Sequence, residues 1–377
     1  MLYLDNAATT AVRPEVVEAM LPYLTRSFGN PSSHHTVGEE AARALSDARA
    51  RIARIVGMRA GDIVFTSGGT EANNLAVKGI AIAATVNRGA RHVVTTPIEH
   101  ESILESVAYL ERVHGFEVTM LPVSSEGRVS PDDLADALSD DTALVAVGYA
   151  NNEIGTIQDA PALARVVRER RIPLHLDAVQ AAGWIPLAGT DADSLAIAGH
   201  KVGAPKGTGV LAVRGRIPIE PLLHGGGQER GRRSGTEDVA GAVGLATALE
   251  LAEAERAEDA AAVGAICRSF ISRVLTLVPS ARLTGDLERR LPGTASFTFA
   301  GTSGEAVLLE LERRGVVSSS GSACAAGSDE PSHVLVALGI APEIAQTAVR
   351  FTLPHGLRRP LDAVADAVAA SVAAVGG

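Results

Sequence analysis

Short apolar runs alternate with stretches of helical periodicity from about residue 60 to 215. They predict strands at 63–65, 92–95, 118–121, 144–147 and 174–176, and helices at 71–84, 102–113, 132–138 and 160–170. Strands that alternate with helices indicate an α/β fold with a mostly parallel sheet covered on both faces. Ligands bind beyond the carboxyl ends of the strands in such sheets. The residues that follow each strand are therefore the first candidates for chemistry.

The pattern changes after Thr236. An Ala- and Glu-rich tract carries apolar residues at spacings of three and four and predicts one long helix. This helix spans 241–278. It is followed by a strand at 295–299, a helix at 305–313, a Gly/Ser loop at 318–328, a strand at 349–351 and a helix from 361 onward. This mixture predicts a smaller α+β domain onto which the N-terminus folds back. We expect a large domain at 15–255 and a small domain made of 1–14 with 256–377.

Composition narrows the class of protein. Lys and Arg number 34 against 44 Asp and Glu, and this acidic balance argues against direct nucleic-acid binding. Two cysteines exclude a disulfide framework and are typical of a reducing compartment. No signal-peptide pattern occurs, and no uninterrupted apolar stretch reaches the ~18 residues of a membrane span. We therefore expect a cytoplasmic protein without a membrane or nucleic-acid partner. Aromatic residues make up only 3%, which predicts an aliphatic core.

The segment Thr66-Ser67-Gly68-Gly69-Thr70-Glu71 lies between a predicted strand and a predicted helix. Small residues let backbone amides approach an anion, and a helix N-terminus adds partial positive charge. The segment is no Walker loop, because GxxxxGK[ST] is missing. A phosphate cup and an ordinary helix capped by Ser67 or Thr70 explain it equally well.

Two polar residues, His175 and Asp177, lie at the end of the predicted strand at 174–176 and directly after it. The alternation of side chains along a strand puts His175 and Asp177 on the same face. A carboxylate in a poorly solvated crevice needs a cationic partner, and a protonated pyridine nitrogen would serve. A buried ion pair and half of a metal site are the alternatives.

Lys201 follows the apolar run 194–198, with small residues around it and no acidic residue nearby in sequence. Loss of hydration lowers the pKa of such an amine and makes it a nucleophile, suited to a Schiff base with an aldehyde cofactor. Lys206 lies in a Pro/Gly turn, where we expect it to be solvated.

The two cysteines differ in their surroundings. Cys267 lies between Val263, Phe270 and Val274 on a predicted helix face, which is typical of a small buried apolar residue. Cys324 lies in a Gly- and Ser-rich loop, where a thiol can move and react. An incidental exposed thiol is the alternative.

Taken together, these segments resemble the cysteine desulfurases of the NifS/IscS type, which are pyridoxal 5'-phosphate (PLP) enzymes. The resemblance implies the aspartate-aminotransferase-like α/β fold (PLP fold type I), with a mostly parallel central sheet and a smaller α+β domain. The loop form SSGSAC looks like the first of the two desulfurase groups. The matching motifs lie at 3–10, 28–33, 67–74, 98–100, 151–155, 175–177, 199–201, 225–229, 233–236, 320–324 and 350–351.

The resemblance implies a PLP-dependent sulfurtransferase. Lys201 would hold the cofactor and move the Cα proton of L-cysteine, and Asp177 would pair with the pyridine nitrogen. His100 would stack on the ring. Cys324 would attack the substrate sulfur, which leaves L-alanine and a persulfide that is passed to an acceptor protein. Arg350 would clamp the substrate carboxylate, a bidentate task suited to a guanidinium.

Further contacts are implied by position. The other implied cofactor ligands are Asn151 and Gln180 at the ring hydroxyl side, and Gly69, Thr70, His200 and the partner subunit's Thr236 at the phosphate. The other implied substrate contacts are Asn151, Ala8 and Asn30. The resemblance implies a homodimer without a metal site, whose acceptor serves iron–sulfur cluster assembly, tRNA thiolation or DNA phosphorothioation. Many relatives have a serine where this chain has Ala198, so we expect one fewer hydrogen bond to the phosphate.

Three other hypotheses stay open. An aminotransferase or a selenocysteine lyase on the same scaffold would differ in its products. A metal-dependent hydrolase would use His175, Asp177 and His200. A non-catalytic scaffold of a sulfur pathway would keep only the fold, although the set of Lys201, Asp177 and Cys324 argues against it.

Overall fold

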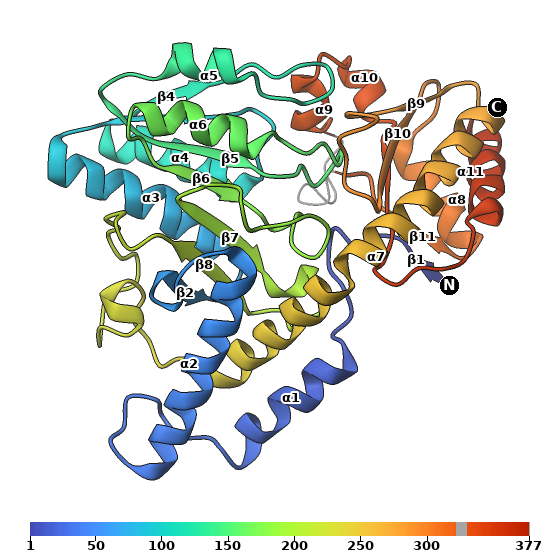
Figure 1. Cartoon of the computed structure of the whole chain (residues 1–377). Coiled ribbons are helices and arrows are strands. Elements are labelled where there is room, and N and C mark those ends of the chain that lie inside the picture. Colours follow the sequence, from blue (N-terminus) through green and yellow to red (C-terminus); the bar gives the residue numbers. More distant parts are fainter. Residues whose placement is uncertain (322–329, 377) are drawn as a thin grey trace.

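A seven-stranded sheet forms the centre of the larger part of the molecule (Figure 1). The computed structural model describes residues 1–321 and 330–376. In sheet order, the strands are β2 (Ile63–Thr66), β8 (Gly209–Val213), β7 (Ser194–Ala198), β6 (Leu174–Asp177), β5 (Thr142–Gly148), β3 (His92–Thr95) and β4 (Glu117–Met120). Neighbouring strands are parallel except at β8, which is antiparallel to β2 and β7. The prediction of a mostly parallel sheet is confirmed, although the sequence analysis did not assign β8.

Helices cover both faces of this sheet. One face packs against α3 (Gly69–Arg88) and α4 (Glu101–His114). The other packs against α2 (Thr36–Val56), α5 (Pro131–Ala137), α6 (Ala160–Glu169) and the first part of α7 (Val239–Leu277). Alternate strand residues separate the two cores: Leu144 and Ala146 enter one, and Val145 and Val147 enter the other.

The long helix α7 connects two hydrophobic cores. Its residues 239–252 join the core of the large sheet, whereas Val263, Phe270 and Val274 join a second core. By length and composition alone α7 could cross a membrane. In the fold it packs against α1 (Pro14–Thr25), α2 and α11 (Asp362–Val375) (Figure 1). Helices α1 and α2 precede residue 60, where the sequence analysis assigned no element.

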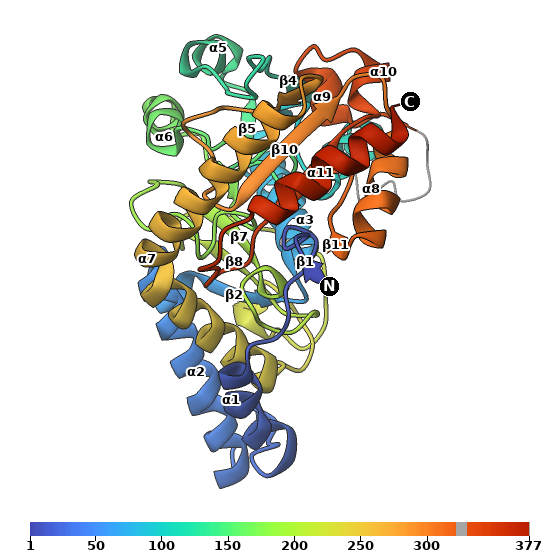
Figure 2. The ribbon, with the colours of Figure 1, turned by 90° about the vertical axis from the view of Figure 1, so that its right-hand side faces the viewer.

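The second core lies under a three-stranded antiparallel sheet of order β12-β10-β9. Its strands are β9 (Ala281–Leu283), β10 (Thr294–Phe299) and β12 (Val349–Thr352). Figure 2 shows α11 and the second half of α7 along this sheet, with α8 (Gly304–Arg313) beside α11. Four phenylalanines pack here, so the expectation of an aliphatic core holds for the large sheet only: Phe270, Phe297, Phe299 and Phe351.

The N-terminal segment joins this second part of the molecule. Strand β1 (Leu2–Tyr3) pairs in parallel with β11 (Val316–Val317), and Leu4 is fully buried in the second core. Two short helices, α9 (His333–Ala337) and α10 (Pro342–Ala345), form a small cluster with Ile98 and Ile154 of the large part. The carboxyl ends of β3, β5, β6 and β7 therefore face residues contributed by the N-terminus and by β12.

Candidate active site

The connection from β2 to α3 forms an anion-binding cradle. Gly68 is the N-cap of α3, with φ 155°, and no side chain caps the helix. The alternative of a cap by Ser67 or Thr70 is therefore wrong. A Cβ on Gly209 would lie 2.5 Å from the Gly68 Cα, so β8 approaches this loop only as glycine. The first backbone N–H groups of a 20-residue helix thus lack a capping side chain, as a bound phosphate requires.

Asp177 and His175 lie on the same face of β6, as predicted. The Asp177 Oδ1 accepts a hydrogen bond from the Val179 N–H at 2.9 Å, and its Oδ2 accepts one from Asn73 Nδ2 at 2.7 Å. His175 Nε2 lies 3.0 Å from Asn73 Oδ1. Within residues 1–321 and 330–376, no cationic side chain pairs with Asp177. The alternative of a buried ion pair therefore finds no support in the part of the chain that the structure describes.

A metal site at the end of β6 also lacks support. Both ring nitrogens of His175 are engaged, one by Asn73 and one by the Ser194 hydroxyl at 2.9 Å. Among the described residues, no group of three or more His, Cys, Asp and Glu side chains could hold a metal ion. Burial lowers the pKa of His175 to about 3, so this ring is neutral at physiological pH.

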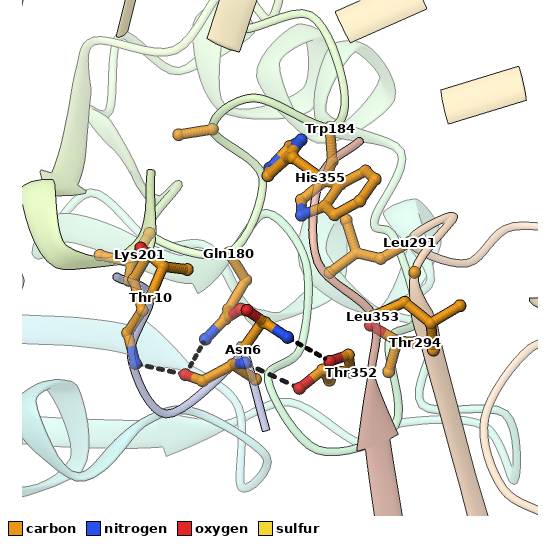
Figure 3. Close-up of a pocket in the computed structure, with 14 residues that line it drawn as sticks. Asn6, Thr10, Gln180, Trp184, Lys201, Leu291, Thr294, Thr352, Leu353 and His355 are labelled. Atoms are coloured by element: carbon orange, nitrogen blue, oxygen red, sulfur yellow. Dashed lines mark hydrogen bonds between the residues drawn. The ribbon is translucent and has the colours of Figure 1, made fainter. Parts of the chain in front are cut away.

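Lys201 lies in a short 3-10 turn directly after β7. Its Nζ donates hydrogen bonds to the carbonyls of Ala7 and Ala8, the latter at 2.8 Å. Gln180 Nε2 donates to the same Ala7 carbonyl at 3.0 Å (Figure 3). Lys201 and Gln180 line a cavity of about 20 Å³, which is also lined by Trp184 and by His355 stacked on it. The N-terminal segment thus lies directly against the lysine that sequence reasoning selected.

The two histidines of the site have different partners. His100 caps α4, and its Nδ1 accepts from the Ser102 N–H at 3.0 Å. His200 Nδ1 lies 3.2 Å from the Thr9 hydroxyl. Burial, helped by the positive charges of Lys201 and Lys206, lowers the pKa of His200 to about 4. At neutral pH His200 can therefore hydrogen-bond to a phosphate but adds no charge to it.

Arg350, on β12, presents an unsatisfied donor. The residue is 2% exposed, with Nη2 donating to Asp5 Oδ1 at 2.7 Å and Nη1 donating to the Asn152 carbonyl at 2.9 Å. Among the residues that the structure describes, its Nε is buried and has no hydrogen-bond partner. Since buried N–H groups are almost always paired, this donor indicates that a further hydrogen-bond acceptor completes the site, and a carboxylate would suit the guanidinium.

Asn151 has a second task that sequence reasoning missed. Its Oδ1 accepts from the N–H groups of Glu153 and Ile154, at 2.8 and 3.0 Å, and its Nδ2 donates to the Ile98 carbonyl at 2.8 Å. The side chain oxygen is therefore committed to a turn after β5. One N–H of the amide is left for a ligand.

Not all of the predicted residues come together in one chain. The positions that meet at the carboxyl ends of the strands are Ala8, Gly69, Thr70, His100, Asn151, Asp177, Gln180, His200, Lys201 and Arg350. Thr236 lines a separate cavity of about 170 Å³ beside Ser67 and is exposed. Asn30 lies between α1 and α2, at the opposite end of the large part (Figure 1). Cys324 lies outside the described residues.

Two buried polar residues lie in matching motifs, but the sequence analysis gave neither of them a role. Asn73 is 1% exposed and bridges Asp177 to Ser102, and Glu99 is 3% exposed, with burial raising its pKa to about 8. The signal for Asn73 is its place on the buried face of α3, four residues after Gly69 and four before Val77.

Comparisons with known proteins identify the family of this chain. Residues 2–355 match the aminotransferase class-V family. The chain is 45% identical over 354 residues to the cysteine desulfurase IscS of Dictyoglomus turgidum, covering 93% of this chain and 89% of that protein. The chain belongs to the aminotransferase class-V family, in its cysteine desulfurase group. The expectation of a PLP-dependent desulfurase is confirmed at this level.

Solved structures of the same group share the whole fold. A NifS-like protein superposes with a TM-score of 0.88 at 36% identity, over 98% of both chains. The structure of SspA in complex with cysteine has a TM-score of 0.82 at 35% identity, over 94% of this chain and 99% of that one. The predicted PLP fold type I is therefore confirmed.

The residues present fit PLP, the cofactor of this family. The uncapped start of α3 suits its phosphate, and Gly69 is so close to β7 that an added Cβ would lie 3.2 Å from that of Ala198. Asp177 has no cationic partner among the described side chains and suits the pyridine nitrogen. Lys201, in the turn after β7, has an amine that suits covalent attachment.

Proposed function

We propose that this chain takes sulfur from L-cysteine, releases L-alanine and carries the sulfur on Cys324 as a persulfide for an acceptor protein. The observation that carries the proposal is the buried Nε of Arg350, which has no partner within residues 1–321 and 330–376. Arg350 and Lys201 both contact the segment of residues 5–8: Arg350 through Asp5 and Lys201 through Ala7 and Ala8. An amine and a carboxylate-binding guanidinium on one short segment suit an α-amino acid.

Each residue then has a physical task. PLP, when bound, supplies an electron sink that makes the Cα proton of the substrate acidic. Lys201 Nζ accepts and returns that proton, and Arg350 orients the substrate by its carboxylate. Asp177, held by its two N–H donors, would pair with the ring nitrogen.

The sulfur transfer balances without an added oxidant or reductant. The Cys324 thiolate attacks the substrate sulfur, so a new S–S bond forms and the substrate C–S bond breaks. The electron pair of the broken bond stays on the substrate carbon, which takes up a proton and leaves as alanine. Cys324 is left as a persulfide.

A homodimer completes the proposal. Val17, Leu21 and Leu24 form an exposed apolar stripe on α1, and Phe28, just beyond α1, is 73% exposed. These residues are spaced four and three apart, so they share one face of α1, while another face of the helix packs on α7. An exposed apolar face of this kind is suited to contact with a second copy of the chain. Thr236 is exposed beside the phosphate loop and is proposed to reach the partner's phosphate. Size-exclusion chromatography with light scattering of Leu21→Glu tests this; a wild-type monomer would contradict it.

The acceptor follows from the chemistry: a persulfide is passed to another thiol by exchange, so we propose a protein acceptor with a reactive cysteine. We propose the cytoplasm as the location, because a chain of this length with only two cysteines is typical of a reducing compartment. Iron–sulfur cluster assembly, tRNA thiolation and DNA phosphorothioation are the candidate destinations. No direct contact with nucleic acid or membrane is proposed.

Replacing each cysteine in turn tests the proposal, because the chain has only two. Cys324→Ser should bind PLP as the wild type does and yet form no persulfide and no alanine from L-cysteine. Cys267→Ser is the matched control: the residue is 2% exposed in the second core, and its variant should keep activity within about twofold. Wild-type turnover by Cys324→Ser would refute the role of Cys324. A keto acid product, or strict preference for selenocysteine, would favour an aminotransferase or a selenocysteine lyase.

A further inference from the structure

We propose that Asn73 is a positioning residue of the desulfurase reaction, whose amide fixes both the Asp177 carboxylate and the His100 ring. This inference rests on the proposed function, in which Asp177 and His100 face the cofactor. Asn73 is 1% exposed and lies on α3, one turn after the phosphate cradle. A single side chain thus links the cradle, the ring-nitrogen partner and the ring-stacking histidine.

The hydrogen-bond donors and acceptors around Asn73 leave one consistent arrangement. Asp177 Oδ2 is an acceptor, so the Asn73 group that faces it at 2.7 Å is the NH₂. The second N–H of that group donates to the Ser102 Oγ at 2.8 Å. Asn73 Oδ1 must then accept, and its partner at 3.0 Å, His175 Nε2, must carry the proton.

The Asp177 carboxylate locks the direction of this amide, because its oxygens can only accept. The His175 ring is fully buried and neutral, so with its proton on Nε2 its Nδ1 accepts from the Ser194 hydroxyl at 2.9 Å. Rotation of the Asn73 amide by 180° would place two acceptors against each other at Asp177 and would force His175 into its other tautomer. Buried mismatches of this kind are strongly unfavourable, so the amide is held in one orientation.

The second branch reaches His100 through the hydroxyl of Ser102. Ser102 Oγ accepts from Asn73 and lies 2.9 Å from His100 Nδ1. The same Nδ1 accepts from the backbone N–H of Ser102 at 3.0 Å, so this nitrogen carries no proton and the Ser102 hydroxyl donates to it. The backbone of Ser102 thus sets the tautomer of His100. Asn73 acts on the ring by holding the hydroxyl that donates to it.

The role of Asn73 goes beyond packing. An apolar residue of the same shape would fill the space but would make none of these hydrogen bonds. Asn73 supplies one of the two N–H donors of Asp177; the other is the backbone of Val179. Without Asn73, the Oδ2 atom loses its donor, and Asp177 is free to turn away from the ring nitrogen. Catalytic geometry is sensitive to displacements of this size.

Two variants test the proposal in the PLP-loaded enzyme. Asn73→Ala removes the donor, and Asn73→Asp keeps the shape but places an acceptor against Asp177. Asn74→Ala is the matched control: it is the next residue of α3, and its amide donates to the Thr70 carbonyl at 2.9 Å instead. The readouts are kcat per bound PLP, KM for L-cysteine, the visible absorption maximum of bound PLP and the thermal midpoint.

We expect both Asn73 variants to lose about tenfold or more in kcat per bound PLP, with KM within about threefold, as for loss of a hydrogen bond to a charged group. We also expect the absorption maximum of bound PLP to shift in both, and Asn74→Ala to match the wild type. A lower thermal midpoint with wild-type kcat and spectrum would show a structural role only and overturn the proposal. Absence of alanine formation by the wild type itself would instead refute the proposed function.

Discussion

The buried His175 makes a measurable prediction about stability and pH. Its ring is fully buried, and burial lowers its pKa to about 3, whereas an unfolded histidine titrates near ~6.5. Below pH 6.5 the unfolded chain therefore binds a proton that the native ring does not. The native state loses stability from this residue as the pH falls from 6.5 toward 3.

The size of the effect follows from these values. At pH 5 the unfolded ring is mostly protonated and the native ring is not, so the loss is about 2 kcal/mol relative to pH 7.5. For a chain of this length, that corresponds to a fall of about 2–3 °C in the thermal midpoint. The replacement His175→Gln keeps an N–H donor near Asn73 but removes the titration.

The assay is the thermal midpoint of PLP-loaded wild type and His175→Gln at pH 7.5 and pH 5. Carboxylates that titrate in this range contribute to both proteins, so the difference between their pH slopes isolates His175. His224→Gln, at an exposed site, controls for removal of a histidine. We expect the slope of His175→Gln to be shallower by about 2 °C. Equal slopes for all three proteins would refute the reasoning.

Three other substitutions or labels give further tests. Arg49→Met should lower the free energy of unfolding by about 3–5 kcal/mol in urea titration, because it leaves the Glu229 carboxylate buried without its bidentate partner. Gly209→Ala should weaken PLP binding about tenfold or more in a fluorescence titration, because its Cβ would lie 2.5 Å from the Gly68 Cα. Iodoacetamide at pH 8 should spare Cys267 in the native protein, because burial raises its pKa to about 11.

Each of these tests has its control and its contradicting result. Arg43→Met breaks only an exposed pair with Glu39 and should cost under about 1 kcal/mol; equal losses for both arginines would contradict the first. Gly61→Ala meets no atom within 4 Å and should bind PLP as the wild type does, so unchanged binding by Gly209→Ala would contradict the second. The prediction for Cys267 would be contradicted if iodoacetamide labelled this residue as rapidly in the native protein as in protein unfolded in guanidinium.

The sequence indicated the parts of the fold that local patterns determine. Alternating apolar runs and helical periodicity predicted most of the large sheet and the helices between its strands. The two-residue repeat placed His175 and Asp177 on one face. The apolar run before Lys201, and the small residues around it, selected that lysine. Strand β8 was missed because a buried run of five apolar residues has no periodicity that separates it from other apolar segments.

The rest depends on contacts between distant segments. Arg350 meets Asp5 across 345 residues of sequence, and Asn73 meets Asp177 across 104. No local pattern predicts such pairs. The placement of Asn30 likewise needed the fold. Its motif matched the family, but in the structure the residue lies in the connection between α1 and α2, away from Lys201 and Asp177.

The central claim is that Lys201 carries PLP at the carboxyl ends of the strands. The chain has only three lysines, at positions 78, 201 and 206, so borohydride reduction of the PLP-loaded protein followed by peptide mass spectrometry gives a direct answer. We predict one stable adduct, on the peptide that contains Lys201. No adduct after PLP is supplied, or an adduct confined to Lys78 or Lys206, would contradict the account.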